Sequence, residues 1–89
     1  MHAVVVKVTI NDPEAATQSL KDEVVPAVSQ SPGFVAGYWT GKEDTNTGLA
    51  MILFESEEAA SGAAERVRSM VSDAVTVDDV EVREVVASA

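Results

Sequence analysis

The sequence predicts an α+β fold in which one antiparallel sheet packs against two helices. Three observations favour this class. First, β-branched residues are concentrated in separate short segments. Second, two intervening segments begin with helix-capping residues and continue with an apolar stripe. Third, a polar segment bounded by glycines joins two of the expected strands directly. The order of elements is therefore β-α-β-β-α-β. With right-handed crossovers and a central hairpin, this order is typical of a ferredoxin-like arrangement with both helices on one face.

Length and composition predict one packed domain over residues 1–89. Hydrophobic residues make up 46% and charged residues 24% of the chain, an ordinary balance for a folded domain. A net charge of −9 argues against a nucleic-acid or anionic-membrane partner. The absence of cysteine excludes thiolate catalysis and cysteine-ligated metals. Because Lys7 interrupts the first apolar run, we expect neither a signal peptide nor a membrane span, and a cytoplasmic location.

The first third of the chain predicts a strand followed by a helix. Residues 3–10 are rich in β-branched side chains, and Asp12 followed by Pro13 is typical of a helix start. Because Pro26 has no N–H to donate, we expect a kink or break near Val25. The residues expected to face the core are Val4, Val6, Val8 and Ile10 in the strand, and Ala16, Leu20, Val24 and Ala27 in the helix.

The rest of the chain predicts a hairpin, a helix and a last strand. Residues 34–40 and 49–54 are expected to form strands joined by a polar hairpin tip at 41–47. Ser56 is expected to cap the second helix, and residues 75–87 predict a charged strand at a sheet edge. The first and third strands are the most apolar and are expected in the centre. The buried stripe of the second helix is expected to contain Ala60, Ala63, Ala64, Val67 and Val71.

Two helices cover only one face of such a sheet, and the second face is also apolar. An antiparallel sheet with a wet face alternates apolar and polar residues. The third strand instead carries Leu49, Met51 and Leu53 on one face and Ala50, Ile52 and Phe54 on the other. Alternation places Val35 and Trp39 on one face of the second strand and Phe34 and Tyr38 on the other. We therefore expect a homodimer through the sheet face; the alternative is a monomer with an unusually apolar sheet.

Two segments of the chain resemble the dimeric α+β barrel superfamily, and within it the antibiotic-biosynthesis-monooxygenase-like group. They are Val24–Thr40, with a Pro-Gly turn that leads into a strand, and Leu49–Ala60, with a strand that runs into an acidic-capped, alanine-rich helix. The resemblance implies a homodimer whose two sheets face each other, with a pocket between sheet and helices in each subunit. Members of the family include cofactor-free monooxygenases of polycyclic aromatics, haem-degrading enzymes and proteins of no known activity.

Few residues offer catalytic or metal chemistry. His2, the single histidine, would need a pocket position and an orienting partner to act as a general base, and the alternative is a terminal residue without a role. Haem-degrading relatives hold iron with a helical histidine, which neither expected helix contains. The acidic groups at Asp78–Glu81 and Glu55–Glu58 lack the spacing of a calcium loop, so we expect a solvated surface. We assign no catalytic residue, no metal and no cofactor.

Trp39 is the strongest candidate for ligand contact. Gly33 and Gly37 are expected on its face, where missing side chains leave room beside the ring for a ligand or a partner's side chain. The alternative is ordinary core or dimer packing. The oxygenases that the chain resembles place a Trp, an Asn and an Arg around the substrate. Trp39 and Arg66 match two of these types, but Asn11 and Asn46 lie in expected loops, so no triad is assigned. The residues expected to line an apolar pocket are Trp39, Phe34, Met51 and Leu53.

Three hypotheses for function follow. The first is a small homodimeric α+β barrel protein that binds an apolar or aromatic small molecule between sheet and helices. The second is a cofactor-independent monooxygenase of the antibiotic-biosynthesis type. Such chemistry depends mainly on binding and desolvation of a substrate that supplies its own electrons, so missing cofactor motifs do not exclude it. The third is a purely structural or accessory oligomer.

Overall fold

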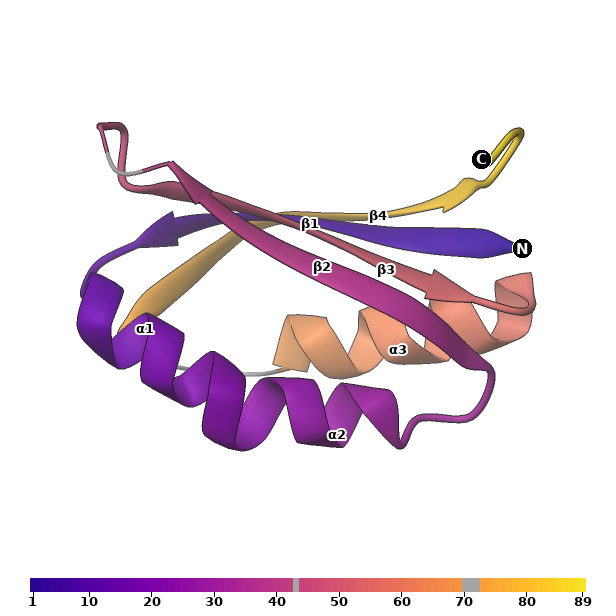
Figure 1. Cartoon of the computed structure of the whole chain (residues 1–89), viewed down its shortest axis with the longest axis horizontal. Coiled ribbons are helices and arrows are strands. Elements are labelled where there is room, and N and C mark those ends of the chain that lie inside the picture. Colours follow the sequence, from indigo (N-terminus) through magenta and orange to yellow (C-terminus); the bar gives the residue numbers. More distant parts are fainter. Residues whose placement is uncertain (43, 70–72) are drawn as a thin grey trace.

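A computed structural model describes residues 1–42, 44–69 and 73–89 of the chain. Within these residues the strands form one antiparallel sheet in the order β2-β3-β1-β4, with β1 and β3 in the centre as expected (Figure 1). This mixed α+β arrangement is compatible with a ferredoxin-like fold. The strands are β1 (His2–Ile10), β2 (Phe34–Lys42), β3 (Thr47–Phe54) and β4 (Val75–Glu84). The helical segments are α1 (Pro13–Ser19), the π-helical η1 (Leu20–Val24), α2 (Val25–Ser29) and α3 (Glu57–Ser69).

The helices all lie against one face of the sheet, as Figure 1 shows. We call this the helix face and the opposite one the outer face. The core lies between the helix face and α3, where the side chains of Val4 and Phe54 are fully buried. The ring of Phe34 meets that of Phe54 edge to face, with centroids 6.2 Å apart. The expected alanines Ala60, Ala63 and Ala64 are buried and Val67 is partly buried, whereas Val71 lies outside the described residues.

Both predicted helix caps are confirmed. The Asp12 carboxylate accepts a hydrogen bond from the Ala15 N–H at 3.2 Å, and the Ser56 hydroxyl accepts one from the Ala59 N–H at 3.1 Å. Each contact satisfies one of the free N–H groups that a helix leaves at its start. The sequence therefore determines where both helical passages begin.

The expected kink near Val25 takes the form of a π-helical turn. The Val25 N–H donates to the Leu20 carbonyl, five residues back, just before Pro26, which has no N–H. The wider turn accommodates one extra residue and rotates everything that follows. As a result Val28 is buried against the sheet and Ala27 is exposed, which corrects the expectation that Ala27 faces the core.

A bulge at the start of β2 changes which residues share a face. Phe34 lies opposite Phe54, but Ala36 already lies opposite Leu53, so Val35 is an extra residue in β2. One extra residue shifts the alternation, and Phe34 and Trp39 both pack on the helix face. The expectation that they point to opposite faces is therefore wrong, because the bulge interrupts the strict alternation of side chains between them.

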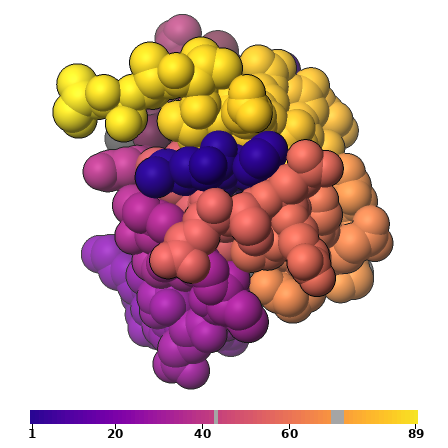
Figure 2. Space-filling view, turned by 90° about the vertical axis from the view of Figure 1, so that its right-hand side faces the viewer, coloured from indigo at the N-terminus to yellow at the C-terminus, as the bar shows by residue number. Residues whose placement is uncertain are grey.

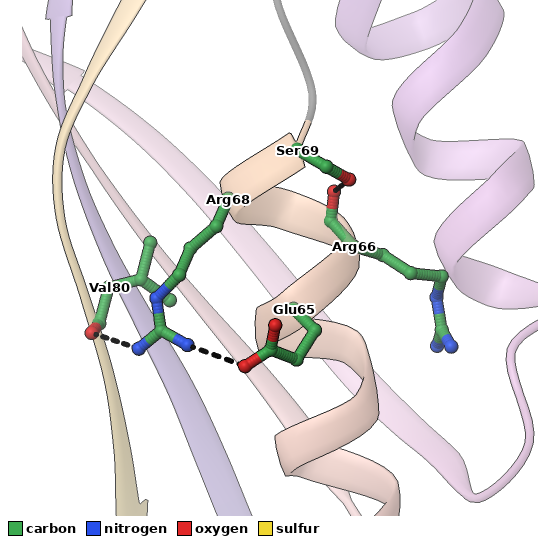
Figure 3. A network of polar contacts seen from close by, with 5 residues as sticks. All are labelled: Glu65, Arg66, Arg68, Ser69 and Val80. Carbon is green, nitrogen blue, oxygen red and sulfur yellow. Dashed lines mark hydrogen bonds and ion pairs between the residues drawn. The ribbon is translucent and has the colours of Figure 1, made fainter.

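The charged strand β4 forms an edge of the sheet, as expected, and α3 contacts that edge. An Arg68 guanidinium N–H donates to the Val80 carbonyl at 3.1 Å, while another lies 3.4 Å from the Glu65 carboxylate (Figure 3). The bond to Val80 satisfies a backbone acceptor on a strand that pairs with β1 alone. Strand β4 ends at Glu84, before the expected boundary at residue 87.

Candidate functional site

An apolar cavity of about 160 Å³ lies between the helix face and the helical segments. Residues of the sheet and of both helical passages form its walls, and none of the lining residues that the structure describes is charged. Ser19, Thr40 and Leu49 are also among the lining residues, and the Thr40 hydroxyl donates to the Leu49 carbonyl at 2.7 Å. The principal apolar lining residues are Val8, Ile10, Leu20, Val24, Trp39 and Val67.

The cavity exists because the sheet carries very small residues around one large ring. Trp39 lies opposite Ala50, and Gly48 lies two residues before Ala50 on β3. A methyl group added at Gly48 would lie 2.8 Å from Val8 Cγ2, so this glycine faces the cavity that it lines. Gly48 lies between the expected hairpin tip and the expected strand at 49–54, and it was not among the residues expected to line a pocket.

The structure does not bring the four expected pocket residues together. Trp39 lines the cavity, whereas Phe34 lies on the same face but packs against Phe54 and is not part of the lining. Met51 and Leu53 lie on the outer face, because the neighbouring residues of β3 point to the helix face and strand residues alternate. Of the four expected residues, Trp39 lines this cavity, together with aliphatic residues of β1 and the helices.

Gly33 and Gly37, which were expected on one face, lie in different parts of the structure. Gly37 lies beside Trp39 on β2, as expected. Gly33 lies in the turn before the bulge with a φ of +77°, and a methyl group there would lie 2.9 Å from the Ala59 Cβ. It serves the turn from α2 into β2 and does not contribute space beside Trp39.

The outer face presents a second apolar surface. Tyr38, Met51 and Val5 lie side by side across three strands, and Tyr38 is 65% and Met51 44% exposed. Leu49 and Leu53 extend this group along β3. We call these five residues the outer patch. No helix of the described chain covers it (Figure 1).

Charged residues border the outer patch on the β4 side. Lys7 lies opposite Asp79, and Glu81 lies opposite Val5. The Arg83 Nε donates to the Glu81 carboxylate at 2.7 Å. This hydrogen bond and the positive charge of Arg83 lower the pKa of Glu81, and the more distant Lys7 acts in the same direction.

Replacing Arg83 with glutamine is expected to raise the pKa of Glu81 toward its ordinary value. A lowered carboxylate pKa stabilises the fold above the pKa of the unfolded chain, and this contribution is lost as the pH falls through the pKa of the folded state. The variant is therefore expected to lose stability at neutral pH and to show a smaller further loss on acidification than the wild type. An NMR titration of the Glu81 carboxyl carbon checks this. An unchanged Glu81 titration in the variant would contradict the assignment to Arg83.

His2 does not contact the cavity. Its Nε2 lies 3.5 Å from the Glu57 carboxylate, and its Nδ1 is buried without a hydrogen-bond partner among the described residues. Figure 2 shows the start of β1, in indigo, between the C-terminal segment and the residues where β3 leads into α3. Because His2 is not among the cavity-lining residues, it is not in position to act as a base on a molecule held there.

The Trp–Asn–Arg arrangement of the oxygenases is also not assembled. The Arg66 side chain extends away from Arg68 (Figure 3) and is not part of the cavity lining. The Asn11 amide donates to the Thr76 hydroxyl at 3.0 Å, and Asn46 occupies the hairpin turn with a φ of 52°. No cluster of His, Asp or Glu side chains suited to a metal ion occurs among the described residues.

Comparison with models of known protein families and with curated protein sequences finds no match for this chain. Among the described residues, no helix is both long enough and apolar enough to cross a membrane.

Proposed function

We propose that the protein is a homodimeric α+β barrel protein that binds a neutral apolar or aromatic small molecule in the cavity beside Trp39. The observation that carries the proposal is the cavity itself, a space of about 160 Å³ with no charged side chain among its described lining residues. An ionised ligand would lose its hydration there without a compensating charge, so the lining favours neutral molecules. An apolar cavity of about 150 Å³ in another protein stays dry and binds benzene, which makes ligands of this size appropriate.

The outer patch supports the homodimer. Exposed aromatic and aliphatic side chains on a sheet face are typical of an interaction surface. The border of this patch carries both signs of charge, with Lys7 beside Asp79 and Glu81. In a two-fold interface the same surface appears on both partners, so Lys7 of one copy can form ion pairs with acidic groups of the other. A second copy of the chain is therefore the occupant that this surface suits.

Fluorobenzene is a suitable first probe for the cavity. We expect a saturable change in its ¹⁹F signal when the protein is added, accompanied by a shift of the indole N–H resonance of Trp39, the single tryptophan of the chain. Trp39 fluorescence titrated with toluene provides an independent measurement. The absence of saturable binding of fluorobenzene and of toluene would contradict the proposed function.

A further inference from the structure

We infer that Gly37 determines which ligands the cavity admits, by seating the Trp39 indole against strand β2. The inference rests on the proposed function and specifies its ligand class. It concerns neutral molecules with one aromatic ring, or of similar size. Among the lining residues that the structure describes, Trp39 is the only aromatic one, so its position controls how much space remains.

The contact between Gly37 and Trp39 is unusually close. A methyl group built on the Gly37 Cα would lie 2.8 Å from Cη2 and 2.9 Å from Cζ3 of the indole. Carbon atoms that are not bonded to each other pack at about 3.5–4.0 Å. The indole thus occupies the space that any other residue's Cβ would fill. Only glycine at position 37 permits this ring position.

The neighbours of the indole determine where it would move if displaced. On the Gly37 side, the ring of Phe34 closes the space, since its Cε2 would lie 3.6 Å from the added methyl group. Phe34 is itself held by its edge-to-face contact with Phe54. Open space lies on the cavity side. An alanine at position 37 therefore pushes the indole into the cavity and reduces its volume.

The same geometry explains the size limit. With the indole seated on Gly37, the remaining space is about 160 Å³. A similar volume holds one benzene ring in an engineered cavity. To enlarge this space for a fused two-ring molecule, the indole would have to move further toward β2, where the Gly37 backbone and Phe34 leave no room. We therefore expect fluorobenzene to bind at least about tenfold more tightly than naphthalene, a factor that corresponds to about 1.4 kcal/mol.

Gly37→Ala tests the inference, with Gly41→Ala as a matched control on the same strand and face. Neither glycine has a positive φ, so alanine fits the backbone at both positions. Among the described residues, a methyl group at Gly41 meets only Ile10 Cδ1, at an ordinary 3.6 Å. We expect Gly37→Ala to weaken fluorobenzene binding at least about tenfold and Gly41→Ala to change it less than about twofold. Circular dichroism verifies that both variants are folded.

A Trp39→Phe variant provides a second background in which the contact between Gly37 and the indole is absent. In Trp39→Phe the shorter ring lacks the outer indole atoms that contact Gly37, so adding Gly37→Ala is expected to have no further effect on binding. Wild-type affinity in Gly37→Ala, or equal losses in both backgrounds, would overturn the inference while leaving the proposed function intact. Equal affinities of the wild type for fluorobenzene and naphthalene would also overturn it. If the wild type binds neither probe, the proposed function fails and the inference fails with it.

Discussion

Replacing Phe54 with alanine is expected to lower the free energy of unfolding by about 3–5 kcal/mol, as is typical of a large ring removed from a core. Phe54 is fully buried at the end of β3, and its ring makes the edge-to-face contact with Phe34. Removing it leaves a void between the sheet and α3, where the surrounding alanines are too short to fill the space. A small domain has a total stability of about 5–15 kcal/mol, so the variant is expected to be close to unfolding.

Urea denaturation followed by circular dichroism measures this loss. Val86→Ala is the control, because Val86 is 87% exposed and its substitution is expected to stay within about 0.5 kcal/mol of the wild type. A loss below about 1 kcal/mol for Phe54→Ala would contradict the described core.

Replacing Met51 with glutamate is expected to weaken the proposed dimer on the order of 100-fold, the effect of losing a central contact worth about 2–3 kcal/mol. Met51 lies between Tyr38 and Val5 in the middle of the outer patch, and each residue of a two-fold interface occurs twice. Two new carboxylates would then be buried against apolar surface, and Glu81 lies in the same cross-strand row as Met51, on the other side of Val5. The cavity faces the other side of the sheet, so ligand binding within each subunit is expected to persist.

Analytical ultracentrifugation over a range of concentrations measures this effect. Ser61→Glu, on the exposed surface of α3, adds the same charge away from the outer patch and is expected to leave the dimer unchanged. A dimer of unchanged affinity in Met51→Glu would exclude the outer patch as the interface. A wild-type protein that stays monomeric at all concentrations would contradict the homodimer altogether.

The candidate site was only partly accessible to prediction from sequence. Trp39 lines the cavity with Gly37 beside it, and a large ring next to missing side chains is a local pattern in the sequence. Met51 and Leu53 lie on the outer face, and their alternation with buried residues is also visible in the sequence. The contributions of Leu20 and Val67 to the cavity come from two helices far apart in the chain, and no local pattern links them.

Local physical chemistry in the sequence determined the order of elements, the two capped helix starts, the central position of β1 and β3, and the edge position of β4. Each of these features depends on residues that are close together in the chain: the density of β-branched residues, the side chains that cap helices, and the local charge. The tertiary structure alone decided which face Phe34 and Val28 occupy. A bulge at Val35 and a π-helical turn before Pro26 each insert one residue, and a single inserted residue shifts every later side chain. The cavity beside Trp39 follows from that shift, because it arises where the small residues of two paired strands meet the helices.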